Sequence, residues 1–158
     1  MYNSFKDTIA EAYQQVELFN EIAGNFDNVT IDSLDSQLSF VYEELVETID
    51  ALESKDDKEY IDGLADIFVT VAGLLQKSEK AGYNVSDAIR LVNINNLEKF
   101  PSSSTDPTTT QPKDTTIIFD SRFDVVVYKD VNGKVKKPLD FVPVNLNGAY
   151  PDFLKGGV

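Results

Sequence analysis

Apolar residues recur at intervals of three and four along the first hundred positions, which is the spacing of amphipathic helices. Short polar stretches separate these segments, as in antiparallel helix pairs. The pattern predicts four helices, near residues 4–23, from about 33 or 35 to 54, 58–80, and from a cap at 84 or 86 to 99. We therefore expect residues 1–100 to form a helical bundle.

The pattern changes after residue 100. Residues 101–114 are rich in Pro, Ser and Thr and are expected to form a flexible linker. Two β-branched and aromatic runs follow at 115–119 and 123–128, and Asn132-Gly133 is typical of a tight turn. We expect a mainly α protein with a small C-terminal β-hairpin. Because an isolated hairpin is marginal, the extension 115–158 should pack on the bundle or on a neighbouring subunit.

The second predicted helix carries three acidic residues and no nearby basic partner. Glu43 and Glu47 lie about 40° apart on its surface, and Glu44 lies about 60° from Glu47. A run of acids on a helix is usually a solvated face. The third helix changes this interpretation.

Residues 64–75 of the third helix are apolar on every side except for Asp66 and Thr70, which is typical of a buried helix. A lone carboxylate in such a helix is costly unless it is compensated. Asp62 shares the face of Asp66 at i and i+4. Two such helices facing each other would gather four or five carboxylates, a donor set that suits Mg²⁺ or Mn²⁺.

The composition narrows the chemistry further. The 158 residues include no His and no Cys, which removes the usual zinc ligands and most nucleophilic mechanisms. The formal net charge of −13 argues against binding to nucleic acid or to anionic membranes. The sequence shows neither a signal pattern nor an apolar run of membrane-spanning length. A cytoplasmic location, in a bacterium or a phage-infected host, is expected.

The acidic blocks resemble those of a known superfamily. Glu43-Glu44-Leu45-Val46-Glu47, then Asp62-Gly63-Leu64-Ala65-Asp66, then Asn96-Leu97-Glu98-Lys99 occur in the order found in the all-α nucleoside triphosphate pyrophosphatases. This group includes MazG, the dimeric dUTPases and phosphoribosyl-ATP pyrophosphohydrolase-like proteins. The resemblance covers roughly residues 35–100. It implies an all-α pyrophosphatase bundle that acts on a nucleoside triphosphate with Mg²⁺ and assembles as a homodimer or homotetramer.

The resemblance also implies roles for single residues. Glu43 is the candidate general base, and Asn96 and Lys99 are candidates for contacting the substrate. The predicted metal ligands are Glu44, Glu47, Asp62 and Asp66. Lys134, in the only dense basic cluster of the chain, is a further candidate for binding the triphosphate.

One position departs from the superfamily pattern. The second motif is usually Glu-x-x-Asp, but the residue three before Asp66 is Gly63. An acid stands one place earlier, at Asp62, as in the phage-type branch, and we take it as the ligand in preference to Glu59. The expected reaction converts a (deoxy)nucleoside triphosphate to monophosphate and pyrophosphate, in nucleotide-pool control.

Other functions remain open from the sequence alone. Within enzymes, the specificity of a dUTPase or of a phosphoribosyl-ATP pyrophosphohydrolase is the nearest alternative. A non-catalytic metal-binding helical interaction module is the alternative outside enzymes.

Overall fold

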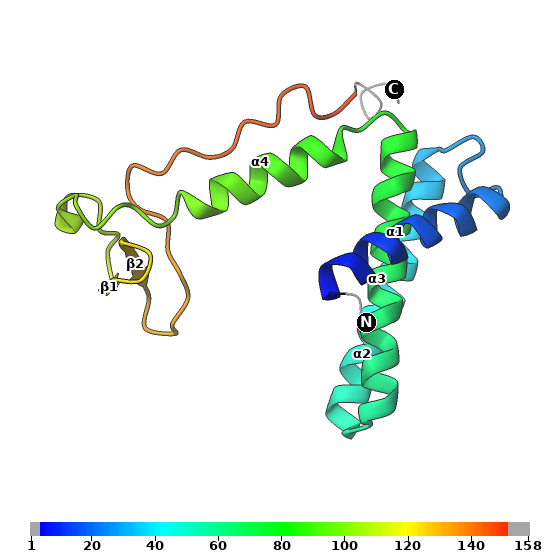
Figure 1. Cartoon of the computed structure of the whole chain (residues 1–158), viewed down its shortest axis with the longest axis horizontal. Helices are drawn as coiled ribbons and strands as arrows, with labels where there is room; N and C mark the ends of the chain where they lie inside the picture. Colours follow the sequence, from blue (N-terminus) through cyan, green and yellow to red (C-terminus); the bar gives the residue numbers. More distant parts are fainter. Residues whose placement is uncertain (1–3, 152–158) are drawn as a thin grey trace. The chain divides into compact units, whose positions relative to one another are not determined.

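A computed structural model describes residues 4–151 of the chain. It is mainly helical, with one small antiparallel sheet near the C-terminal end of this range (Figure 1). The predicted fold class is confirmed. The described residues divide into two compact units, one reaching to Val85 and including Tyr150 and Pro151, the other being Ser86–Ala149.

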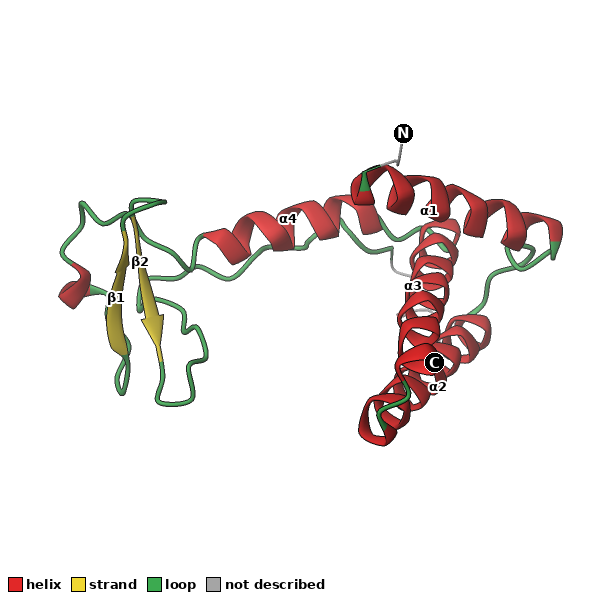
Figure 2. Ribbon diagram, turned by 60° about the horizontal axis from the view of Figure 1, so that its bottom comes forward, coloured by secondary structure: helices red, strands yellow, loops and turns green. Residues whose placement is uncertain are grey.

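The first unit contains three long helices, each begun by a capping side chain. α1 spans Phe5–Ile22, α2 spans Ile31–Ser54 and α3 spans Asp57–Lys80. Ser4 and Thr30 each form a reciprocal capping box, and Asp56 accepts a hydrogen bond from the Glu59 backbone N–H at 3.1 Å. Only Lys55 and Asp56 separate α2 from α3, so the two helices fold back on each other as an antiparallel pair (Figures 1 and 2).

The interior of the first unit is more polar than its helical pattern predicts. Its buried hydrophobic residues in the described range are Val16, Ala51 and Ala72, and all are small or medium-sized. The buried polar residues are Asn20, Gln37, Thr48, Gln76 and Lys77. Many large apolar side chains of α2 and α3 are instead exposed in the single chain. Side-chain hydrogen bonds also join these helices, such as the bond from the Gln76 amide nitrogen to the Tyr13 carbonyl at 2.9 Å.

The second unit is built around a two-stranded hairpin (Figure 2). β1 spans Thr116–Asp120 and pairs antiparallel with β2, Val125–Lys129, with Ile118 opposite Val127. The core residues Val126 and Tyr128 have no exposed surface. The unit also holds most of α4, Val85–Leu97, and a short 3₁₀ helix η1, Pro107–Thr109.

Residues 101–114 make several of the contacts that bury this hairpin. The Tyr128 hydroxyl donates to the Pro107 carbonyl at 2.8 Å and lies 2.7 Å from the Thr110 hydroxyl. The backbone N–H of Val126 donates to the Pro101 carbonyl at 2.8 Å. Backbone groups of a Pro- and Thr-rich segment thus complete the hydrogen bonding of β2.

Within residues 4–151, none of the helices has both the length and the apolar character needed to cross a membrane.

Candidate active site

The helices that carry the acidic residues approach each other closely at Gly63. A Cβ atom added to Gly63 would collide with the hydroxyl oxygen of Thr48 on α2, and it would lie 3.1 Å from the Thr48 Cβ and 3.3 Å from its Cα, closer than ordinary van der Waals contacts. Thr48 is buried, and its hydroxyl donates to the Glu44 carbonyl at 2.7 Å. Thr48 and Gly63 therefore fix the register of α2 against α3. Asp62 and Asp66 flank this contact on one helix, and Glu44 and Glu47 flank it on the other.

The carboxylates of both helices influence one another at Glu44. Its side chain is half-buried, whereas Glu43, Glu47, Asp62 and Asp66 are exposed. Burial raises the pKa of Glu44 above its ordinary value, and the charges of Asp66, Glu47, Glu43 and Asp62 raise it further, in that order. All five predicted acids thus contribute to one electrostatic cluster, with members from α2 and α3.

No basic side chain in the described residues forms an ion pair that would neutralise the negative charge of this cluster. None of the five acids takes part in an ion pair within the described part of the chain. The nearest lysine along α3, Lys58, pairs instead with Glu59 at 2.5 Å, and this contact raises the pKa of Lys58. A bound cation would stabilise a half-buried carboxylate that is surrounded by others and lacks a basic partner.

The donor set fits a magnesium ion by its chemistry, since every candidate is a carboxylate oxygen. In residues 4–151, however, no three acidic side chains are already arranged so that they could hold a metal ion. Four of the five side chains are exposed and have rotamer freedom, so binding would require them to turn toward Glu44. The structure brings the predicted ligands into one region without closing them into a coordination shell.

The predicted substrate residues Asn96, Lys99 and Lys134 belong to the second unit. Asn96 and Lys99 lie together at the end of α4, where the Lys99 ammonium donates to the Asn96 side-chain oxygen at 2.6 Å. The neighbouring Asn95 has a different role. Its side chain donates to the Val142 carbonyl at 2.8 Å and accepts from the Val144 N–H at 3.0 Å, so it holds the returning chain against α4.

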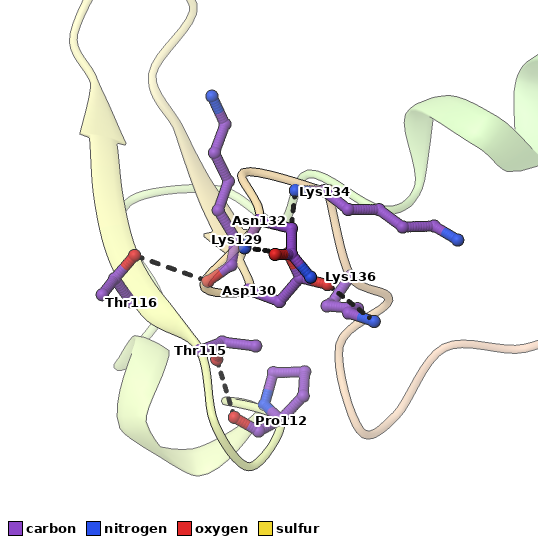
Figure 3. A network of polar contacts seen from close by, with 8 residues as sticks. All are labelled: Pro112, Thr115, Thr116, Lys129, Asp130, Asn132, Lys134 and Lys136. Atoms are coloured by element: carbon purple, nitrogen blue, oxygen red, sulfur yellow. Dashed lines mark hydrogen bonds and ion pairs between the residues drawn. The ribbon is translucent and has the colours of Figure 1, made fainter.

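Lys134 lies in the turn that follows β2 (Figure 3). The Asp130 carboxylate accepts from the backbone N–H groups of Asn132 and Lys134, at 2.9 and 3.0 Å, and forms an ion pair with Lys136 at 3.0 Å. These donors, Lys136 first, lower the pKa of Asp130. The backbone of the turn is thereby fixed, while the side chains of Lys129 and Lys134 extend away from it (Figure 3).

Two features of the first unit were not predicted from the sequence. One is an apolar groove of about 230 Å³ between α1 and α3, lined by Ala12, Gln15, Val16, Phe19 and Val69. Val69 lies one helical turn after Asp66 on α3. The other is a buried polar junction in which Asn20 of α1 and Gln37 of α2 both lie against Gly73 of α3.

A helical hairpin with facing carboxylates on both helices is the arrangement expected for the all-α nucleoside triphosphate pyrophosphatases. The comparison with protein families agrees with this class. The family model for phosphoribosyl-ATP pyrophosphohydrolase matches residues 25–89, from the loop before α2 into α4. The resemblance to the MazG-like and phosphoribosyl-ATP pyrophosphohydrolase-like superfamily is therefore confirmed for this segment, and it points to a pyrophosphohydrolase acting on a nucleotide. No curated protein and no solved structure shows a significant match to the chain.

Proposed function

We propose that the chain hydrolyses a (deoxy)nucleoside triphosphate between its α and β phosphates in the presence of Mg²⁺, releasing a monophosphate and pyrophosphate. One observation carries this proposal. The half-buried Glu44 is surrounded by carboxylates from both α2 and α3, and none of them has a basic partner in the described residues. The match of residues 25–89 to a pyrophosphohydrolase family supports the bond that is cleaved.

The acids divide into two roles. Glu44, Glu47, Asp62 and Asp66 would hold Mg²⁺, or Mn²⁺ in its place. A bound divalent ion supplies charge neutralisation for the phosphates and acidity for a water molecule. Glu43 is exposed and adjacent to these ligands. It would accept a proton from the attacking water. A general base must lie within hydrogen-bonding reach of that proton, and the position of Glu43 next to the ligands meets this requirement.

Further side chains would contact the substrate. The apolar groove between α1 and α3 offers Phe19 and Val69, which are 65% and 43% exposed, for contact with the nucleoside. Asn96, Lys99 and Lys134 would contact phosphate or sugar. The sequence of the second unit, 86–149, has eight acidic and eight basic residues, so the net charge of −13 resides in the rest of the chain. The second unit is therefore the better source of cations for a triphosphate.

We also propose that the chain functions as a homodimer or homotetramer. Five apolar residues of α2 repeat at alternating intervals of four and three and are between 45% and 69% exposed: Leu38, Tyr42, Leu45, Ile49 and Leu52. This is the spacing of a helix–helix seam. The stripe one position earlier, which includes Gln37, Thr48 and Ala51, already faces the interior.

A second copy of the chain is the natural partner for this seam. The buried hydrophobic residues of the first unit are three small or medium side chains, too few to stabilise helices of 18 and 24 residues. Ile61 and Leu64 add exposed apolar surface on α3, at 65% and 45%. Burying both helices against another copy would supply the missing core.

The test of the reaction is an assay of pyrophosphate release. The wild-type chain is offered each canonical ribo- and deoxynucleoside triphosphate, dUTP and phosphoribosyl-ATP, with Mg²⁺ or Mn²⁺. We expect turnover that is lost in Glu47→Gln and in Asp66→Asn while the circular dichroism spectrum is unchanged. Glu53→Gln, an exposed change of the same kind farther along α2, is the matched control and should retain activity.

Two results would contradict the proposal. If wild type releases no pyrophosphate from any of these compounds while Mg²⁺ raises its melting temperature, the acids form a non-catalytic metal site. If Mg²⁺ changes neither activity nor melting temperature, the acidic cluster is an ordinary solvated face.

A further inference from the structure

The two edges of the β1–β2 hairpin differ in what covers them. On β2, the Val126 N–H donates to the Pro101 carbonyl at 2.8 Å. The Tyr128 carbonyl accepts from the Lys136 N–H, also at 2.8 Å. Backbone groups of alternate residues point to opposite sides of a strand, so these two β2 residues face away from β1 and their neighbours bond to it. The outer edge of β2 is therefore covered by other segments of the second unit.

The outer edge of β1 has no such cover. The register places Ile118 opposite Val127, one of the β2 residues that bond to β1. Ile117 and Phe119, on either side of Ile118, therefore direct their backbone N–H and C=O groups away from β2. Among the described residues, no backbone group outside the hairpin forms a hydrogen bond with Ile117 or Phe119.

This edge also lacks the features that usually protect an exposed strand. Natural edge strands often carry charged residues, Pro or a bulge. Residues 116–119 contain no charge and no Pro, and β1 pairs with β2 residue for residue without a bulge. Ile118 and Phe119 are 41% and 60% exposed. Unpaired backbone groups beside exposed apolar side chains favour pairing with a further strand.

We propose that β1 of a second copy of this chain pairs antiparallel with this edge, centred on Ile118. The pairing places Ile117 of each copy opposite Phe119 of the other. Both residues direct their backbone groups outward, so these two pairs form four hydrogen bonds. Ile117 and Phe119 also share the sheet face of Tyr128 and Val126, which are fully buried. The apolar face of each hairpin thus continues into the other, and a four-stranded sheet results.

The charges that flank β1 favour a second copy in this register. Centring on Ile118 brings Asp114 of one copy opposite Arg122 of the other. The Arg122 side chain is 77% exposed, although it also pairs with Asp120 of its own chain. Centring one residue earlier would bring Asp114 opposite Asp120, and like charges directly opposite each other are destabilising. Centring one residue later would place Ile118 opposite Asp120. The strand is therefore complementary to itself about Ile118, as an isologous contact requires.

A single introduced cysteine tests this contact directly, because the chain has none. In the proposed register Ile118 faces its own copy in a non-hydrogen-bonded pair, with Cα atoms about 4.5 Å apart. A disulfide can bridge that separation. The whole chain carrying Ile118→Cys, oxidised with diamide, should form a covalent dimer on a nonreducing gel.

Thr116→Cys is the matched control for this experiment. Thr116 is exposed and lies on the same strand and the same face as Ile118. In the proposed register, however, the two copies of Thr116 are offset by four residues, or about 14 Å along the strands. That separation is too long for a disulfide, so the covalent dimer should be about tenfold less abundant than with Ile118→Cys.

A second variant tests the contact without oxidation. Ile118→Lys places two like charges opposite each other at the centre of the pairing. It should halve the light-scattering mass of the wild type, whether or not the α2 seam also forms, because each isologous interface doubles the number of chains. Val131→Lys, at a 93% exposed apolar position in the turn after β2, is the control and should leave the mass unchanged.

The inference is overturned if Ile118→Cys forms no more covalent dimer than Thr116→Cys, or if Ile118→Lys leaves the mass unchanged. The edge of β1 would then be free or would receive an extended peptide of another protein. The proposed hydrolase would stand in either case, because none of its residues lies on β1.

Discussion

Replacing Gly63 with Ala is expected to destabilise the contact between α2 and α3. This is the opposite of the usual effect, because Ala normally stabilises a helix relative to Gly. In an unconstrained helix the change would stabilise by about 0.5–1 kcal/mol. Here the new methyl group would collide with the Thr48 hydroxyl oxygen, and it would lie 3.1 Å from the Thr48 Cβ and 3.3 Å from its Cα. Overpacking of a tight contact costs about 1–3 kcal/mol. The expected net effect is a loss of about 1–2 kcal/mol.

The assay is urea unfolding followed by helical circular dichroism, at one protein concentration for all variants because association contributes to apparent stability. Gly73→Ala is the matched comparison, since its nearest neighbours are the ends of the Gln37 and Asn20 side chains, which can move. It should cost less than Gly63→Ala. In a Thr48→Ala background the cost of Gly63→Ala should fall by about 1 kcal/mol, the signature of coupled sites.

The reasoning would be refuted by a Gly63→Ala variant that is as stable as the wild type or more stable. Only the helix-propensity gain would then be visible, and α2 and α3 would not be in close contact at Thr48. A full cost that persists in the Thr48→Ala background would place the strain elsewhere.

Three further outcomes are expected. Without metal, Glu44→Gln should raise the free energy of unfolding at neutral pH. The pKa of Glu44 in the folded state lies above its ordinary 4.5, so the ionised side chain destabilises the folded state once the pH rises through that pKa. Urea unfolding should therefore show Glu44→Gln as more stable than wild type at pH 7 and as equally stable below pH 4.5. Leu45→Lys should lower the light-scattering mass toward the 17.6 kDa of one chain, and an unchanged mass would argue against the α2 seam. Tyr128→Phe removes a buried hydroxyl with two partners, costs about 1–3 kcal/mol, and should speed amide exchange in β1 and β2.

The sequence predicted the helices well because their ends have local signals. α3 was expected from Lys58 to Lys80 and spans Asp57–Lys80, in agreement with the polar connection before it. α2 begins at Ile31, earlier than the expected start near Ser33 or Asp35, because Ser33 is the third residue of a capping box with Thr30 rather than the cap itself. The apolar periodicity predicted the helix, but its first turn became evident only from the capping hydrogen bonds between Thr30 and Ser33.

The hairpin was predicted with a shifted second strand. β2 begins at Val125 rather than at Phe123, because Asp124 has a positive φ of 55° and ends the connection between the strands. The Asn132-Gly133 turn comes after β2. Composition marked 101–114 as irregular, but it carries no signal for the contacts of Pro101 and Pro107 with β2, which depend on tertiary packing.

The grouping of the five acids could be predicted from sequence because their spacing and the absence of basic neighbours are local properties; their roles in metal binding and catalysis stay predictions. The polar junction was not found. Lys77 lies near the C-terminal end of α3, where a lysine usually faces solvent and complements the helix dipole. Its burial depends on α1 and α2 both packing against Gly73. Likewise, Asp66 was expected to be buried but is exposed in the single chain, as are Leu64 and Val69, because much of the apolar surface of α3 has no partner there.

The departure from the Glu-x-x-Asp pattern has a steric reason in this structure. A glutamate at position 63 would place its Cβ against the backbone and side chain of Thr48, so the helices could not keep their present separation. Asp62 stands one residue earlier, about 100° around the helix from Gly63. It is exposed, yet its charge still raises the pKa of Glu44, together with Asp66. An acid at position 62 thus joins the cluster while a glycine at position 63 allows the close packing. These observations support Asp62 as the fourth metal ligand.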